Sequence, residues 1–197
     1  MRIAIDIDGV LRDTFNKIEQ IYQKYFIDEL ELVDDEFNYE IITPYSTPEY
    51  SNHFKFKTDE EYLSFMYEEF AMEIFGHSPS TEMSTFYDLN DLIAKHKDNI
   101  SFLLISKQIG KTKPATLFFI SKFGCEIEKV IFYNQLTKNK IWDEFDVLLT
   151  SNPELLLQTE NKTLIKYETS YNLTTECEHT ITTLKELDKK IETLIEK

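Results

Sequence analysis

Residues 1–14, Met1-Arg-Ile-Ala-Ile-Asp-Ile-Asp-Gly-Val-Leu-Arg-Asp-Thr14, carry the pattern that decides the fold. The apolar residues between positions 3 and 7 predict a buried β-strand. Asp6 and Asp8 lie at its carboxyl end, where an open α/β sheet has its ligand crevice. Two like charges side by side are unfavourable unless a cation lies between them, and Mg²⁺ held by carboxylates, water and substrate phosphate is the usual solution. The stretch therefore predicts a magnesium and phosphate site.

An acidic turn is the alternative interpretation, because Asp and Gly are ordinary turn residues. The context favours the phosphate site, since the motif follows a strand and leads through Val10 and Leu11 into a helical pattern. A receiver domain of the response-regulator type also combines a strand-end acidic pair with Mg²⁺ and a later lysine. That fold has no room for the long segment that separates the first two predicted strands here.

The composition bounds the size of the protein and its partners. The chain has 197 residues, of which 42% are hydrophobic and 14% aromatic, so it can bury one substantial core into which a cap is inserted. The net charge of −15 argues against a surface for the phosphate backbone of a nucleic-acid polymer. A small phosphorylated metabolite or a mononucleotide, held by a metal ion and a few local cations, remains compatible with this charge.

Cysteine usage and hydropathy predict a cytoplasmic protein without a membrane partner. Cys125 and Cys177 are widely spaced and form no Cys-x-x-Cys pattern, so neither a disulfide framework nor a zinc site is indicated. The first residues reach an acidic pair too soon for a signal peptide, and no apolar run approaches the ~20 residues of a membrane span. The oligomeric state is open, and a homodimer is compatible with the sequence.

Strand and helix patterns alternate along the chain, which predicts an α/β fold with a doubly wound parallel sheet. We expect residues 1–14 and 83–197 to form the core and residues 15–82 to form a helical cap inserted after the first strand. In the cap, the spacing predicts helices over 14–28 and 58–76, the second opened by a capping box of Thr58 and Glu61. Further strands are predicted over 100–106, 129–133, 145–150 and 162–167, and further helices over 83–93, 114–123 and 183–196.

Several short motifs together resemble those of haloacid dehalogenase-type phosphohydrolases. They are the Asp6-Ile-Asp-Gly-Val-Leu11 stretch, a strand that ends in Ser106, a lysine before the fourth strand, and Phe145-Asp-Val-Leu-Leu-Thr-Ser-Asn-Pro-Glu154. The arrangement is most similar to the small 5′(3′)-deoxyribonucleotidase branch. The resemblance implies a core of the Rossmann type and a Mg²⁺-dependent phosphomonoesterase, plausibly a 5′-nucleotidase.

The resemblance also implies roles for individual residues. Asp6 would attack phosphorus and form an aspartyl-phosphate, and Asp8 would act as general acid and then as base. Ser106 and Lys107 would bind the phosphate, and Lys140, or alternatively Lys138, would neutralise its charge. Mg²⁺ would be held by Asp6 and the backbone carbonyl of Asp8. Thr150, at the end of the fourth predicted strand, is the further metal ligand that we expect in this chain. Ser106 could instead be a turn residue, and the segment 137–140 could be a solvated loop.

The fourth motif departs from the family pattern. Relatives carry one or two acidic metal ligands after this strand, where the present chain has Thr150 and Ser151. Hydroxyl oxygens are weak Mg²⁺ ligands beside carboxylates, so a lower metal affinity is expected. The alternative function is therefore a catalytically impaired protein of the same fold that binds a nucleotide or a protein partner. The presence of both Asp6 and Asp8 favours activity.

Overall fold

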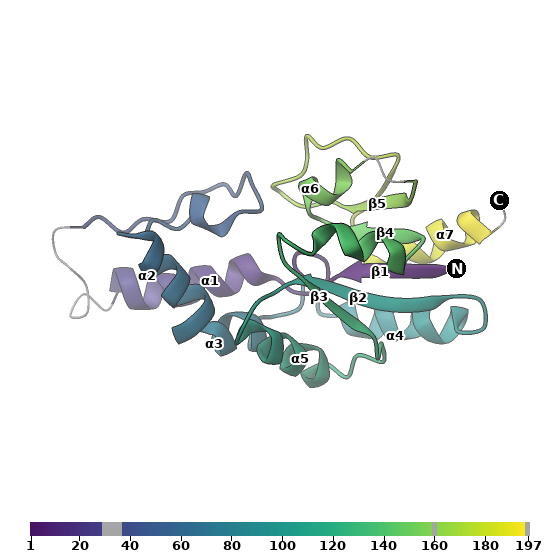
Figure 1. Ribbon diagram of the computed structural model, residues 1–197, viewed down its shortest axis with the longest axis horizontal. Coiled ribbons are helices and arrows are strands. Elements are labelled where there is room, and N and C mark those ends of the chain that lie inside the picture. The colour runs from purple at the N-terminus through teal and green to yellow at the C-terminus, as the bar shows by residue number, and fades with distance from the viewer. Residues whose placement is uncertain (29–36, 159–160, 196–197) are drawn as a thin grey trace.

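The computed structural model describes residues 1–28, 37–158 and 161–195, and its centre is a six-stranded sheet (Figure 1). All strand pairs are parallel, and the strands follow the order β3-β2-β1-β4-β5-β6. This is the α/β doubly wound sheet that the sequence predicts. The strands are β1 (Arg2–Asp6), β2 (Ser101–Lys107), β3 (Val130–Tyr133), β4 (Val147–Thr150), β5 (Thr163–Tyr167) and β6 (His179–Ile181).

The position of β1 in the middle of the sheet creates the site. Ile5 pairs with Leu104 of β2 on one side and with Leu149 of β4 on the other. The strand order reverses direction at β1, because the chain continues to β2 and β3 on one side and returns to β4 on the other. Ligand crevices of open α/β sheets form at such a switch point, outside the carboxyl ends of the strands. Asp6, the last residue of β1, lies at this point.

The two faces of the sheet are covered differently. One face packs its apolar side chains, such as Ile3 and Ile5, against three helices. The opposite face, which includes Ala4 and Leu148, is covered by the 3-10 helix η5 and the short helix α6, and Trp142 is buried there. The covering elements are α4 (Thr85–His96), α5 (Thr112–Lys122), α7 (Leu184–Ile195), η5 (Lys138–Glu144) and α6 (Pro153–Leu156).

A second group of helices lies beside the carboxyl ends of the strands (Figure 1). Its side chains form a separate aromatic cluster that includes Phe15, Tyr22, Phe65 and Phe75, and Ala115 of α5 joins it to the core. These residues come from the segment predicted as a cap, and the division of the chain into core and cap domains stays a prediction. The elements are α1 (Thr14–Tyr22), η1 (Gln23–Asp28), η3 (Tyr50–Asn52), α2 (Asp59–Ser64), η4 (Phe65–Glu69) and α3 (Ala71–Gly76).

Several boundaries differ from the prediction. The helix expected over 58–76 is broken at Phe70, whose ψ of 16° is not helical. Thr58 caps α2 by accepting a hydrogen bond from the Glu61 amide, whereas the Glu61 carboxylate accepts from the amide of Lys57. The helix expected over 14–28 continues beyond Tyr22 as a π-helix.

Strand β6 was not predicted, because its three residues are too few to show a pattern. Both cysteines are free. Within the described ranges, no helix combines the length and the apolar character that crossing a bilayer requires.

Candidate functional site

Asp6 is buried at the floor of the site. The residue is 3% exposed, because β1 is flanked by β2 and β4. Its Oδ2 accepts a hydrogen bond of 2.7 Å from Thr150 Oγ1 at the end of β4. The carboxyl ends of two neighbouring strands thus bring together the Asp6 carboxylate and the Thr150 hydroxyl. Thr150 occupies the position at which the family pattern has an acidic residue.

The Asp8 carboxylate is held by five side-chain donors. Oδ1 accepts from Arg12 Nε at 3.0 Å, from Arg12 Nη2 at 2.7 Å and from Thr14 Oγ1 at 2.8 Å. Oδ2 accepts from Ser106 Oγ at 2.9 Å and from Gln108 Nε2 at 3.1 Å. A carboxylate offers about four lone-pair positions, so Asp8 is saturated by the protein.

Arg12 is a fully buried cation between the core and the helical segment. Its Nη1 donates to the backbone carbonyl of Phe75 at 2.6 Å and to Thr116 Oγ1 at 2.9 Å. Its guanidinium also lies over the rings of Phe75 and Phe119, at 5.1 and 5.3 Å from their centroids. Because Phe75 belongs to α3 and Phe119 to α5, Arg12 fixes the β1–α1 loop to both helices.

The two carboxyl groups are shifted in opposite directions. Burial, followed by the charge of Asp8, raises the pKa of Asp6 to about 8, against the hydrogen bond from Thr150. Burial also acts to raise the pKa of Asp8, but the charge and hydrogen bonds of Arg12 hold that pKa below its ordinary value. Asp8 is therefore charged at neutral pH, whereas Arg12, which pairs with Asp8, lowers the pKa of Asp6 by less than burial and the charge of Asp8 raise it.

Gly9 allows the chain to turn between the two carboxylates and the loops that follow β4 and β5. Its φ is +75°, and a Cβ built there would lie 2.2 Å from Tyr171 Oη and 2.3 Å from Ser151 Oγ. Ser151 Oγ contacts the Asp8 carbonyl oxygen at 3.1 Å and Tyr171 Oη at 2.8 Å. Only glycine fits this position.

A cavity of about 890 Å³ opens above Asp6 and Asp8. It is lined by the β1–α1 loop and the start of α1, by residues 45–51, by the carboxyl ends of β2 and β3, and by the loops after β4 and β5. Side chains of α2, η4 and α3 close it from the helical segment. Its volume is in the range of pockets that bind small organic ligands.

The structure brings together five of the six predicted site residues. Asp6, Asp8 and Lys107 line the cavity, whereas Ser106 and Thr150 are buried behind them and donate hydrogen bonds to Asp8 and Asp6. Ser106 therefore supports a carboxylate and does not face the cavity directly. Lys107 is exposed at the end of β2 and is the lysine nearest in sequence to this group.

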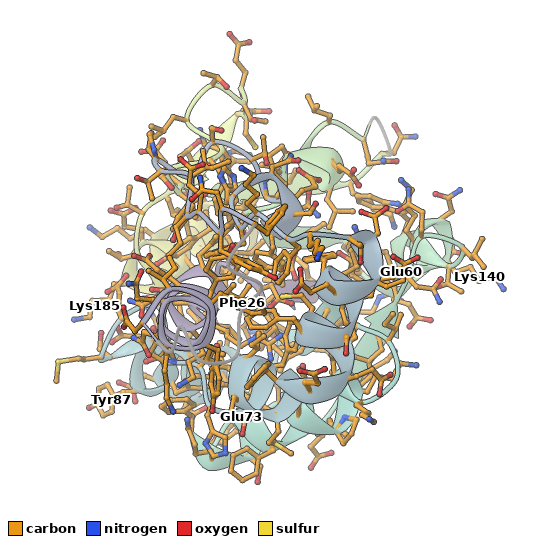
Figure 2. The ribbon with its side chains drawn as sticks, turned by 90° about the vertical axis from the view of Figure 1, so that its left-hand side faces the viewer. Phe26, Glu60, Glu73, Tyr87, Lys140 and Lys185 are labelled. Atoms are coloured by element: carbon orange, nitrogen blue, oxygen red, sulfur yellow. The ribbon has the colours of Figure 1, made fainter. Side chains whose placement is uncertain are left out.

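Lys140 is not part of this arrangement. It is exposed, does not line the cavity, and lies at the edge of the molecule in Figure 2. The reason is that residues 138–144 form a 3-10 helix whose Ile141 and Trp142 pack on the sheet, which directs Lys140 to solvent. The alternative, Lys138, lies 4.0 Å from Glu154 and also does not line the cavity.

Sequence reasoning missed Arg12 and Gln108. The Asp8–Arg12 spacing of four residues was the available signal, but the other contacts of Arg12 come from residues 63 and 104 positions away. Gln108 directly follows the predicted strand and Lys107, and its contact with Asp8 joins residues 100 positions apart.

The oxygen atoms around Asp6 are suited to hold a magnesium ion weakly. Asp6 supplies a carboxylate and Asp8 a backbone carbonyl, which are oxygen ligands of the kind Mg²⁺ prefers, and Mg²⁺ usually keeps several waters. The hydroxyls of Thr150 and Ser151 contact these same oxygens. In the described part of the chain, no group of three or more His, Cys, Asp and Glu side chains is placed to hold a metal ion.

Comparison with solved structures identifies the fold. A protein from Burkholderia xenovorans LB400 assigned as a haloacid dehalogenase-like hydrolase superposes with a TM-score of 0.55 at 10% identity, over 98% of this chain and 97% of that one. One from Bacteroides fragilis with the same assignment gives a TM-score of 0.61 at 13% identity, over 94% and 98% of the two chains.

A third protein, a haloacid dehalogenase-like family hydrolase from Xanthomonas campestris, gives a TM-score of 0.56 at 9% identity, over 98% of this chain and 95% of that one. No protein-family model and no curated protein sequence matches the chain. At these identities the likeness concerns the architecture. The chain has the fold of haloacid dehalogenase-like hydrolases, as the resemblance of its motifs implies.

Proposed function

We propose that the chain is a Mg²⁺-dependent phosphomonoesterase that works through Asp6. The observation that carries the proposal is the position of Asp6 at the carboxyl end of the central strand, on the floor of a cavity that Lys107 also lines. In its ionised form, an Asp6 carboxylate oxygen would attack phosphorus while the bond from phosphorus to the ester oxygen breaks, and the leaving oxygen would take a proton from solvent water. Water would then attack the aspartyl-phosphate, releasing inorganic phosphate and restoring Asp6.

The other residues would bind and orient. The Lys107 ammonium would pair with the phosphate, and Arg12, Thr14, Ser106 and Gln108 position Asp8 through the contacts described above. Bound Mg²⁺, held by Asp6 and the Asp8 carbonyl, would neutralise charge on the phosphoryl group. Because Asp8 is held in its charged form, we assign it the second step, in which the attacking water displaces the Gln108 donor from Asp8 Oδ2 and gives its proton to that oxygen.

The substrate class is a small phosphorylated metabolite. A nucleoside monophosphate is the member that the family resemblance implies, and nine aromatic side chains line the cavity, which could contact a base. Phosphate release should therefore be measured with Mg²⁺ on p-nitrophenyl phosphate and on a panel that includes 5′-nucleotides and alkyl phosphates.

The decisive comparison is between wild type and Asp6→Asn. The variant keeps the size of the side chain but removes the nucleophile, so we expect phosphate release to fall to background. Asp98→Asn removes an exposed carboxylate outside the cavity and should keep wild-type turnover. Turnover of Asp6→Asn close to that of wild type would contradict the proposed function.

A second candidate function is ligand binding without turnover. It is favoured by the hydroxyls of Thr150 and Ser151 in place of carboxylates, and by the distance of Lys140 from the cavity. This function predicts a ligand-binding isotherm without phosphate release and without Mg²⁺ binding by calorimetry. Metal-dependent phosphate release would exclude it.

A further inference from the structure

The cavity above Asp6 has a strongly negative lining. Among the described residues that line it, Lys107 is the only basic side chain. Cavities lined by one sign of charge focus the electric field and concentrate ligands of the opposite sign. Arg12 pairs with Asp8, and Lys166 lies 3.4 Å from Glu168. Among the residues that the structure describes, no ion pair joins a cation to the remaining carboxylates of the lining, so a phosphate beside Lys107 leaves these without a positive counterpart. Beyond Asp6 and Asp8, the carboxylates of the lining are Asp13, Glu19, Glu49, Glu82 and Glu168.

Four aromatic side chains form one wall of the same cavity. Phe15 stacks on Tyr45 with ring centroids 4.4 Å apart. It meets Tyr50 edge-on at 4.8 Å and Tyr171 at 5.5 Å. All four residues line the cavity, and we call them the aromatic wall. Aromatic rings attract organic cations through the negative potential of their faces.

A carboxylate contacts the aromatic wall itself. The Tyr45 hydroxyl donates to Glu19 Oε2 at 2.5 Å. Glu49, which directly precedes Tyr50 in the sequence, lines the same cavity. Burial, followed by the contact with Glu19, raises the pKa of Tyr45, so its hydroxyl stays protonated and donates to the carboxylate. Aromatic rings beside carboxylates are the surroundings that stabilise an alkylammonium group.

An unpartnered acceptor points to a ligand independently of the charge. Gln108 is 3% exposed and lines the cavity, yet its Oε1 has no hydrogen-bond partner. Its orientation is fixed, because the Asp8 carboxylate only accepts and must face the Gln108 amide nitrogen, which lies 3.1 Å away. A buried acceptor without a donor is destabilising, and an N–H or O–H group of a ligand, or a water molecule, would satisfy this oxygen.

The carboxylates of the lining other than Asp6 and Asp8 are dispersed around the cavity. Across the ranges that the structure describes, no three His, Cys, Asp or Glu side chains are close enough together to hold a metal ion. Dispersed carboxylates combined with aromatic faces suit an organic cation, whose charge is spread over several atoms. The cavity of about 890 Å³ also has room for a ligand much larger than phosphate.

We propose that the cavity selects phosphomonoesters whose alcohol portion carries an ammonium group. The phosphate lies beside Asp6 and Lys107, and the ammonium group lies at the aromatic wall near Glu19 and Glu49. The inference relies on the proposed function for the position of the phosphate. It adds that the alcohol portion of the substrate is positively charged. Selection of the cation requires binding only, so it can be measured without turnover.

The test is calorimetric binding to Asp6→Asn, which removes turnover from every measurement. Phosphocholine is compared with 3,3-dimethylbutyl phosphate, in which carbon replaces the charged nitrogen, and 6-aminohexyl phosphate is compared with hexyl phosphate. We expect the charged member of at least one pair to bind about tenfold more tightly at low salt. The preference should shrink as the salt concentration rises.

Variants of the wall locate the effect. Glu19→Gln and Glu49→Gln should each reduce the preference for the ammonium-bearing ligand several-fold. The affinity for the ligand without an ammonium group should stay nearly unchanged. Glu73→Gln, which removes an exposed carboxylate of α3 outside the cavity, is the matched control and should leave the preference unchanged (Figure 2). Thermal melting checks that all three variants fold.

The outcomes separate this inference from the proposed function. Equal affinities within both pairs would overturn the inference, whether or not the wild-type protein releases phosphate. A preference that Glu73→Gln reduces as much as Glu19→Gln would also overturn it. A clear preference in binding, without phosphate release by the wild type, would support cation selection and contradict the phosphomonoesterase.

Discussion

Replacing Asp6 by Asn should stabilise the metal-free protein at alkaline pH. The pKa of Asp6 rises from 3.8 to about 8 on folding, so the folded chain retains a proton that the unfolded chain releases. The stability that this proton provides is fully present below pH 3.8 and is lost as the pH rises toward 8. The loss is at most about 1.4 kcal/mol per pH unit, or on the order of 5 kcal/mol in total. A domain with 5–15 kcal/mol of stability would show this loss clearly.

The assay is urea unfolding in EDTA at pH 5, 7 and 9. The free energy of unfolding of Asp6→Asn, relative to wild type, should increase at each step, because the Asn side chain has no charge to bury. The free energy of unfolding of Asp98→Asn should differ from that of wild type by the same amount at all three pH values. Saturating Mg²⁺ should raise the stability of wild type at pH 9. A pH-independent difference between wild type and Asp6→Asn would refute the reasoning.

Three further predictions follow from the surroundings of Asp8 and Asp6. Arg12→Met leaves the partly buried Asp8 carboxylate without its cation and should lower the free energy of unfolding by about 3 kcal/mol, whereas adding Asp8→Asn should restore part of it, as urea unfolding would show. Gly9→Ala should lose at least about 2 kcal/mol through its clash with Tyr171 and Ser151, and Gly110→Ala, which has positive φ but no neighbour within 4 Å, should lose less. Thr150→Asp should bind Mg²⁺ at least about tenfold more tightly by calorimetry, and an unchanged affinity would exclude this position from the metal site.

The sequence predicted the fold and the first two carboxylates because both depend on local patterns. Buried parallel strands are continuous apolar runs, so β1 to β5 are visible in the sequence. The presence of Asp6 and Asp8 in the site could be predicted because they lie at the end of such a strand. The helical segment was recognisable from its spacing, but the break at Phe70 was not, because no glycine or proline marks it.

The remaining parts of the site depend on tertiary contacts that local patterns do not contain. Arg12 reads as a polar residue in a loop, and it becomes the buried partner of Asp8 only when α3 and α5 pack around it. Lys140 was expected in the site because the family resemblance implies a lysine before the fourth strand. The packing of Ile141 and Trp142 on the sheet decides its direction instead.

The most direct test of the central claim is detection of phosphate on Asp6. Wild-type protein is mixed with Mg²⁺ and a phosphomonoester that it hydrolyses. The reaction is quenched in acid within one turnover, and the protein is analysed by peptide mass spectrometry. The account predicts one added phosphoryl group on the peptide that contains Asp6, and none on that peptide from Asp6→Asn. Turnover by wild type with the Asp6 peptide unmodified, or with the phosphoryl group on another residue, would contradict it.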